Sequence, residues 1–599
     1  MRLPRSIRIH AGALAISFLL PMLLSHPATS YAADTIADRR KTLNSIFEEY
    51  WQSQLRHDPE FASTLGDKRY NDQLTDYSVK AYNEGLERGR GYIDRLGGVD
   101  TTGLSEQEIL SRDLLVRELV EQQESAEYKP WQVPVNQFTG LHSSLPRLFP
   151  QLSYESSKDY DDYITRLGKI PGAFDQIMTN MSIGVGDHHT PPRYLLEKVL
   201  AQVNTLAAQK PEDSPFALPL KKFPASITAA EQQRIRKDAL AAISTQLLPA
   251  YVRFARFLQS QYIPFGRPEP GVWAEPNGQK YYAFRIRQST TTGLTADQIH
   301  QIGLDEVKRD EAEMLVIATR LGFADVAALR KAVASDPKFH PKSREELLAL
   351  YRAHLDQMRP KLPELFGRLP KASLDVVPVP DFIEKDQAPA YYESGSPDGK
   401  RPGKIFINTY HFESRSTPFT ESIAYHEGLP GHHLQISIAQ EVEGLPEFRK
   451  HIFYTAYTEG WGLYAEHLGK DAGLYKDPYS DFGRLEADIF RAIRLVVDTG
   501  VHSKHWTRQQ MVDYFHVHSG LDEASVQSEV DRYIAWPGQA LGYKIGQLKI
   551  LELRAKAQQE LGPKFSLSAF HDQIVDSGVL PLDVLESRVT DWIAAQKSH

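Results

Sequence analysis

Apolar residues recur at spacings of three and four through most of this 599-residue chain, with charged residues between them. This periodicity places the apolar side chains on one face of a helix and therefore predicts amphipathic helices. The predicted helices cover residues 40–58, 72–97, 105–127, 156–182, 228–262, 295–321 and 343–358. Thr295 and Gln298 have the spacing of a capping box at one of these helix starts. The predicted fold class is therefore mainly α.

Two stretches interrupt the helical pattern. Loops rich in proline and glycine are expected at residues 128–155 and 263–280. Extended segments are expected at 281–287, 374–379 and 404–408, where β-branched and aromatic residues alternate with other types. The last of these predicts a small β element shortly before the main sequence motif. We expect an N-terminal helical region over residues 34–270 and a C-terminal catalytic region over 271–599.

The N-terminus has the composition of a secretory signal. Arg2, Arg5 and Arg8 precede an apolar stretch, Ala11–Leu24, and small residues follow it up to Ala33. The pattern predicts a cleavable signal peptide over residues 1–33, with cleavage near Ala32 or Ala33, and a periplasmic or secreted protein. An uncleaved anchor is the alternative. No later stretch is long and apolar enough to predict a membrane span in the mature chain.

Composition excludes several classes of chemistry. The chain contains no cysteine, which excludes disulfides, thiolate metal ligands, a cysteine nucleophile and a lipidated N-terminal cysteine. The net charge is −8 and no basic tract is present, so we expect no nucleic-acid partner.

Residues 426–435 form the most informative motif, His-Glu-Gly-Leu-Pro-Gly-His-His-Leu-Gln. Without cysteine, a catalytic zinc site needs histidine or carboxylate ligands, and two histidines with one glutamate are a common set. In the familiar helical zinc motif the two histidines lie four residues apart, with a glutamate base between them. Here Pro430 occupies the position of the second histidine, and His432 and His433 follow it.

The unusual spacing requires a local distortion. Six residues of an unbroken helix rise about 9 Å, too far for His426 and His432 to share one metal ion. Pro430 and Gly431 are therefore expected to bulge the helix so that His432 reaches the usual ligand position. His433 is the second choice for this ligand. Thr417 and Pro418 predict the start of the motif helix.

The third ligand is expected from a following helix. Glu459 lies 27 residues after His432, enough for a loop and a returning helix. Gly460 and Gly462 flank it, and two helical glycines cost about 1 kcal/mol each, which indicates close packing against another element. Glu466 lies on a similar face and is the fallback ligand.

Several motifs in a fixed order resemble the bacterial domain-of-unknown-function 885 family, a zincin-like group. The resemblance covers about residues 270–595. It is carried by Trp273–Gly278 with Tyr281 and Tyr282, Tyr391-Tyr392 with Asp398–Gly403, His426–Gln435, Glu459–Glu466, Arg494–His502, and Arg532-Tyr533 with Pro537–Tyr543.

The resemblance implies a large helical fold similar to helical zinc peptidases of the gluzincin type, with the small β element beside the active-site helix. It implies one zinc ion held by His426, His432 and Glu459, with Glu427 as the general base. It does not imply a substrate.

Supporting catalytic residues are sought near the same motifs. Tyr533 and Tyr543 are candidate donors to an oxyanion, and His502 is a further catalytic candidate. An ordinary buried side chain is the alternative for each of them. Asp498 follows Arg494 by four residues, which fits either a helical ion pair or a carboxylate partner for a ligand histidine.

Substrate-binding candidates include arginines and one strand. Arg401 or Arg415 could bind a substrate carboxylate, which would favour carboxypeptidase-like action, although solvated arginines are the alternative. Arg532 is a further candidate donor to the oxyanion and is also counted among the substrate-binding residues, with a structural ion pair as the alternative. The strand predicted at 404–408, which ends at Asn408, could lie at a sheet edge and pair with an extended peptide.

The favoured function is a zinc-dependent peptidase acting on a peptide or small amide. The alternatives are a zinc hydrolase of non-peptide esters or amides, and a non-catalytic helical binding protein with a metal site. Glu427 argues against the last of these because a structural site needs no base.

Overall fold

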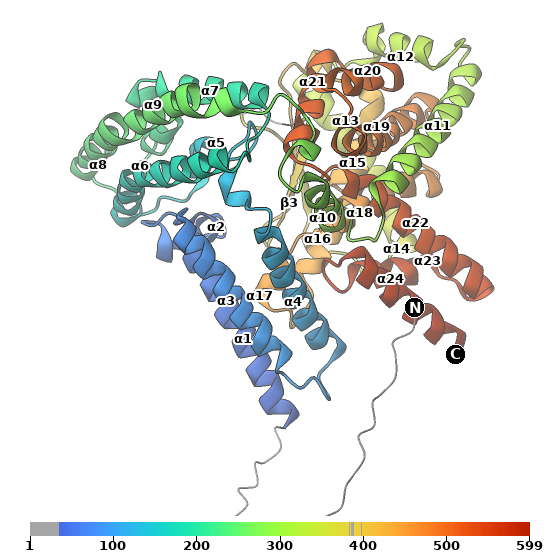
Figure 1. The fold of residues 1–599 in the computed structure, drawn as a ribbon. Coiled ribbons are helices and arrows are strands. Elements are labelled where there is room, and N and C mark those ends of the chain that lie inside the picture. Colours follow the sequence, from blue (N-terminus) through green and yellow to red (C-terminus); the bar gives the residue numbers. More distant parts are fainter. Residues whose placement is uncertain (1–34, 382–383, 385–387, 397, 599) are drawn as a thin grey trace, which may run out of the picture.

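The computed structural model describes residues 35–381, 384, 388–396 and 398–598. The predicted signal peptide, residues 1–33, lies outside the described residues. Helices dominate the described part, and one small sheet accompanies them, which confirms the mainly α prediction (Figure 1). Among the helices described, none combines the length and apolar character needed to cross a bilayer.

The first half of the chain forms a helical assembly beside the second half (Figure 1). Its helices are α1 (Ile36–His57), α2 (Pro59–Thr64), α3 (Val79–Gly97), α4 (Glu106–Ala126), α5 (Leu141–Leu148), α6 (Ser157–Gly186), α7 (Arg193–Ala207), α8 (Ala229–Ala242) and α9 (Leu248–Phe257).

The second half contains the sheet and the remaining helices. Before the motif come α10 (Gly278–Thr290), α11 (Ala296–Arg320), α12 (Val326–Ser335), α13 (Arg344–Met358), α14 (Leu362–Leu365), β1 (Leu374–Pro378), β2 (Ala390–Glu393) and β3 (Gly403–Ile407). From the motif onward come α15 (Thr420–Glu427), α16 (His432–Gln440), α17 (Glu447–His451), α18 (Thr455–Asp471), α19 (Pro478–Ser503), α20 (Arg508–His518), α21 (Glu523–Ala535), α22 (Leu541–Leu561), α23 (Leu567–Val575) and α24 (Leu582–Ser598).

Most predicted helices are present with shifted ends. The capping box at Thr295 is formed with Gln298 at the start of α11. The helix predicted over 72–97 starts later, because Ser78 caps α3 by accepting a hydrogen bond from the Ala81 amide. The helix predicted over 228–262 is divided into α8 and α9 by a π-helical turn at Ile243–Leu247.

The extended segment predicted at 281–287 is wrong, because these residues lie within helix α10. Tyr282, Phe284 and Ile286 alternate in the sequence like a strand, and all three are buried. Tyr282, Ile286 and Ser289 also share one helical face, and this face packs into the core. Over so short a segment, the two-residue period of a strand cannot be distinguished from the 3.6-residue period of a helix. Tertiary packing therefore decides which of the two structures forms.

The two halves have separate cores that interlock at a few side chains. One core lies wholly within residues 135–263, and a second is built mainly from 43–119. Phe448 of α17 enters the second of these cores. In return, Leu114 and Leu195 enter cores of the C-terminal half. The regions predicted as 34–270 and 271–599 therefore touch through shared apolar contacts.

The sheet has the strand order β1-β3-β2. β1 runs parallel to β3, and β2 runs antiparallel to it. β3 is thus the central strand, which contradicts the prediction that residues 404–408 form a sheet edge. The buried face of β3 presents Ile405 and Ile407 to the main C-terminal core. β2, an outer strand, also contacts α15.

Helix α15 is held between α13, α18 and α19. Almost every side chain of α19 is buried, so this helix forms the centre of the C-terminal half. Helix α18 packs tightly along α22 through glycines. A Cβ atom on Gly460 would lie 2.5 Å from Gly546, and one on Gly546 would lie 1.8 Å from the carbonyl oxygen of Ala456. The close packing predicted at Gly460 is confirmed.

This contact yields a stability prediction. Gly546→Ala should lower the free energy of unfolding by about 1–3 kcal/mol, because α18 and α22 must separate to admit the methyl group. Gly91→Ala is the matched control, since nothing lies within 4 Å of that site in α3; it should raise stability by about 0.5–1 kcal/mol. Denaturant unfolding of both variants measures the effect. Equal midpoints for the two variants would show that the α18–α22 contact is loose.

Candidate metal centre

The motif forms two helices separated by a break, and not one bulged helix as predicted. Helix α15 ends at Glu427 and α16 begins at His432. The 3-10 turn Thr417–Phe419 precedes α15, so Thr417 is not its cap. A Cβ atom on Gly431 would lie 1.9 Å from the carbonyl oxygen of His426, so only glycine allows this close approach.

The break brings the two motif histidines together. His426 lies in the last turn of α15 and His432 is the first residue of α16, and their rings are 4.7 Å apart and nearly perpendicular. Trp461 of α18 fixes the break by donating a hydrogen bond of 3.0 Å to the Pro430 carbonyl. The turn between the helices thus does what the bulge was expected to do.

Helix α18 adds the third member of the cluster. His426 Nε2 lies 3.3 Å and His432 Nε2 lies 3.6 Å from the same carboxylate oxygen of Glu459. One ligand atom from each residue lies within 4.8 Å of the others, and this is the one such group found within the described ranges. All three side chains are mostly buried.

These separations fit a zinc site. Four ligands at 2.0–2.1 Å in a tetrahedron lie about 3.3–3.4 Å from one another. The two nitrogen–oxygen separations approach this value and exceed the roughly 2.7–2.9 Å of a charge-assisted hydrogen bond. Two histidines and one glutamate are also a donor set that catalytic zinc commonly has. The residues present therefore fit the predicted metal.

The electrostatics of the cluster favour a cation. Burial would lower the pKa of His426, but hydrogen bonding to Glu459 and Glu466 outweighs burial and raises it to about 10. Burial would raise the pKa of Glu459, yet hydrogen bonding to His426 and His432 holds it well below the usual range. In the metal-free protein a proton supplies the positive charge, and a metal ion would replace it.

Glu466 lies behind His426 and not among the three converging residues. Its carboxylate oxygen is 2.8 Å from His426 Nδ1. Ser422 donates a hydrogen bond to the other oxygen, and Arg491 lies 3.8 Å away. A carboxylate on the far nitrogen orients a ligand histidine and leaves Nε2 free for a metal. Sequence reasoning placed Glu466 on the correct helix face but missed its partners Ser422 and Arg491.

Glu427 and His433 have opposite environments. Glu427 is partly exposed, and its carboxylate makes no hydrogen bond or ion pair with any residue in the described part of the chain. His433 is buried, and both of its ring nitrogens are engaged, Nε2 with the Ala372 carbonyl at 3.1 Å and Nδ1 with the Tyr392 hydroxyl at 3.0 Å. The geometry thus brings His432, and not His433, to the cluster.

Tyr533, Tyr543 and Arg532 belong to one group of side chains, together with Arg494 and Glu529. Tyr533 is fully buried; its hydroxyl donates to Glu529 at 2.5 Å and accepts from Arg494 Nε at 3.1 Å. The Tyr543 hydroxyl accepts a bond of 3.2 Å from Arg532 Nη2 and keeps its own hydrogen for donation. Tyr543 therefore suits the predicted oxyanion role better than Tyr533 does.

His502 and Asp498 are structural. His502 is buried; its Nδ1 accepts from the Val272 amide at 3.2 Å, and its Nε2 donates to the Tyr533 carbonyl at 3.0 Å. Neither nitrogen is left for catalysis. Asp498 accepts hydrogen bonds from the Tyr282 hydroxyl and the Gly538 amide. It therefore pairs with neither Arg494 nor a ligand histidine, because its carboxylate closes the loop after α21 instead.

Two of the remaining substrate-binding candidates, Arg401 and Asn408, donate hydrogen bonds to backbone carbonyls of the protein. Arg401 donates to the carbonyls of Ser394 and Gly395 and so holds its own loop together. Asn408 is buried, and its amide donates to the Glu384 carbonyl at 2.7 Å. Both residues stabilise loops around the sheet.

Arg415 lies closer to the catalytic candidates. Burial raises the pKa of Tyr351; nearby Glu427 raises it further, and Arg415 opposes the shift. Arg415 and Glu427 are therefore neighbours of the same tyrosine. No carboxylate pairs with the Arg415 guanidinium in the described part of the chain.

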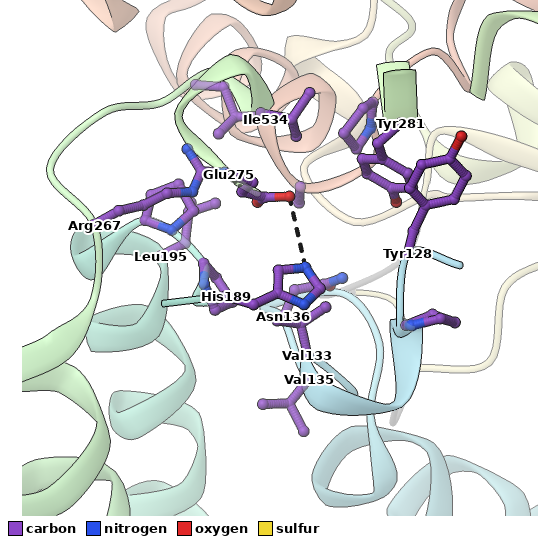
Figure 2. Close-up of a pocket in the computed structure, with 16 residues that line it drawn as sticks. Tyr128, Val133, Val135, Asn136, His189, Leu195, Arg267, Glu275, Tyr281 and Ile534 are labelled. Atoms are coloured by element: carbon purple, nitrogen blue, oxygen red, sulfur yellow. Dashed lines mark ion pairs between the residues drawn. The ribbon is translucent and has the colours of Figure 1, made fainter. Parts of the chain in front are cut away.

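A separate small pocket of about 80 Å³ lies where the two halves meet (Figure 2). Its walls come from segments around Tyr128, His189 and Arg267 in the first half and around Tyr281 and Ile534 in the second. Glu275 joins the walls: its carboxylate lies 3.0 Å from Arg267 and 3.7 Å from His189 (Figure 2). None of the three converging metal candidates lines this pocket.

Comparison with known proteins supplies a family and a fold. The profile of bacterial proteins of unknown function (DUF885) matches residues 59–589. A solved structure described as "the putative lipoprotein from Colwellia psychrerythraea" is 30% identical, with 93% of this chain and 99% of that chain covered and a TM-score of 0.88.

A second solved structure, "a putative lipoprotein of unknown function from Shewanella oneidensis", is 18% identical over 93% of this chain and 99% of that chain, with a TM-score of 0.72. It therefore shares the fold. The comparison with curated proteins gives no match. On the extent of the profile match and the 30% identity, the chain belongs to the family of bacterial proteins of unknown function called DUF885.

Proposed function

We propose that this protein is a zinc-dependent peptidase of zincin-like type. The observation that carries the proposal is the convergence of His426 Nε2, His432 Nε2 and one Glu459 oxygen from three helices. A zinc ion held there would activate a water molecule and polarise the substrate carbonyl.

Glu427 is the proposed general base. It follows the ligand candidate His426 directly, at the C-terminal end of α15, and its carboxylate pairs with none of the described residues. An uncommitted carboxylate can accept the proton of the attacking water and return it to the leaving amine. This would not be expected at a purely structural metal site, which needs no free carboxylate beside it.

Tyr543 is the proposed donor to the oxyanion. Its hydroxyl is oriented by the hydrogen bond that it accepts from Arg532, and its own hydrogen remains available. A donor fixed before the reaction stabilises developing negative charge without reorganising.

The position of the outer strand β2 favours a peptide as the substrate. It pairs with β3 on one side and contacts α15, which carries His426 and Glu427. Outer strands can bind an extended peptide by main-chain hydrogen bonds. We therefore assign peptide pairing to β2, in place of the strand predicted at residues 404–408.

We further propose that the protein is exported to the periplasm or secreted. The N-terminal signal pattern supports export, and the two similar solved structures named above each carry the description "putative lipoprotein". The chain has no cysteine, so it offers no thiol for lipid attachment.

Metal content tests the proposed centre. Purified protein should contain about one zinc per chain, and His426→Ala should contain none, because two ligands cannot retain the ion during purification. His433→Gln is the matched control and should keep its zinc, since His433 binds Ala372 and Tyr392 instead. Elemental analysis measures both. Unchanged zinc in His426→Ala would rule out this centre.

Glu466→Gln tests the orientation of His426. The variant should bind zinc about 10–100-fold more weakly, because the histidine loses a charged hydrogen-bond partner. Glu443→Gln, which changes an exposed glutamate after α16, should leave the affinity unchanged. Competition with a zinc-binding dye measures the affinity. Equal affinity in both variants would contradict the role given to Glu466.

Glu427→Gln tests the base. Screening a mixed peptide library should identify cleaved sequences, and the variant should cleave them about 10²–10⁴-fold more slowly while still binding zinc. Mass spectrometry of the products also reports the cleavage end. Full activity in this variant would remove Glu427 from the mechanism, and cleavage of esters but not peptides would favour the non-peptide alternative.

A further inference from the structure

Five side chains between α19, α21 and α22 form what we call the arginine cluster: Arg494, Glu529, Arg532, Tyr533 and Tyr543. Glu529 lies between the two guanidinium groups, 3.1 Å from Arg494 and 3.4 Å from Arg532. Two guanidinium groups therefore face one carboxylate. Burying an excess positive charge is costly, so the cluster favours the binding of an additional anion.

Donors in the cluster also lack partners. Among the residues that the structure describes, Arg494 Nη1 and Arg532 Nε are buried and have no hydrogen-bond partner. Buried guanidinium groups normally satisfy these donors, and a carboxylate accepts several such bonds at once. The unused donors thus match a carboxylate in both charge and number.

Helices α19 and α22 link the arginine cluster to the groups that pack around the proposed metal centre. Along α19, Arg494 follows Arg491 by about one helical turn, and Arg491 lies 3.8 Å from Glu466 behind His426. Along α22, Gly542 and Gly546 touch the segment of α18 that carries Glu459, and Tyr543 lies between these glycines in sequence. Phe490 packs against both Arg491 and Arg494.

The cluster is partly exposed on one side. Arg494 is 5% exposed and Tyr533 is buried, whereas the side chains of Arg532 and Glu529 are each 20% exposed. A ligand would therefore reach the cluster from the side of Arg532 and Glu529. By contrast, the buried cation Lys544, on the same helix as Tyr543, is matched by two carboxylates, Glu306 at 3.0 Å and Asp488 at 2.7 Å.

We propose that the arginine cluster binds the free C-terminal carboxylate of the substrate, so that the protein cleaves peptides near their C-terminal end. This inference rests on the proposed function, because it names the substrate class of the same site. Arg532 is the accessible anchor, and Arg494 adds the second positive charge. Glu529 holds the two arginines apart and limits the affinity for the incoming anion.

Binding to an inactive background tests the carboxylate site. N-acetyl-tetra-alanine and its C-terminal amide are titrated calorimetrically into the zinc-loaded Glu427→Gln protein. The acid should bind at least about tenfold more tightly than the amide, since charge-assisted hydrogen bonds are at stake. Arg532→Met should abolish the preference, and Arg532→Lys should restore part of it. Arg256→Met, which removes an exposed arginine from α9, is the matched control and should keep the preference.

A variant that is expected to strengthen binding distinguishes an effect on binding from structural damage. Glu529→Gln removes the competing negative charge, so it should bind the acid several-fold more tightly and leave the amide unchanged. A folding defect cannot produce tighter binding. Weaker acid binding in Glu529→Gln, or equal binding of acid and amide before mutation, would overturn the inference. Loss of the preference in Arg415→Met but not in Arg532→Met would overturn it as well.

Turnover separates the two proposals. If the zinc-loaded native protein cleaves the acid and the amide equally, the carboxylate site is wrong and the peptidase stands. If it cleaves neither, but the acid binds in a manner that depends on Arg532, the carboxylate site stands and the proposed peptidase activity is wrong.

Discussion

The pairing of His426 with Glu459 and Glu466 is the interaction on which this structure depends. Each carboxylate would cost several kcal/mol to bury alone, and so would a protonated histidine. Together, one imidazole between two carboxylates compensates for much of this cost, with separations of 3.3 and 2.8 Å. The contact joins α15 to α18.

Glycines, which have no side chain, are as important to this arrangement as the charged residues. Gly431 lets the chain return against the last turn of α15, which places His432 beside His426. Gly462 leaves room for the His426 ring, because a Cβ atom there would lie 2.6–2.9 Å from ring atoms. Gly460 lets α18 approach α22. The charged cluster therefore occupies space that three glycines create.

The central helix α19 connects this cluster with a second polar group. Arg491 faces Glu466, and Arg494, one turn later, belongs to the arginine cluster. A rigid buried helix keeps two such groups at a constant separation. A proposed zinc centre and a proposed carboxylate site held in this way would define where a peptide is cut relative to its end. The same helix also carries His502 and Asp498, whose hydrogen bonds fix the loops at Val272 and Gly538.

Local sequence determined most helices of this protein and the identity of the candidate ligands. Helical periodicity and caps such as Thr295 act within a few residues, so they can be recognised from the sequence without knowledge of the fold. The spacing of the motif likewise required a distortion between His426 and His432. What it left open were choices between equivalent residues, such as His432 or His433, and Glu459 or Glu466.

Only the tertiary structure decided those choices, because each depends on partners distant in sequence. His433 is held by Ala372 and Tyr392, and Glu466 is occupied by His426 and Ser422. The helix at Tyr281–Arg287 and the central place of β3 have the same origin, since burial and strand pairing are set by segments elsewhere in the chain. The sequence predicted which residues would form the cluster, and long-range packing determined the partners of each.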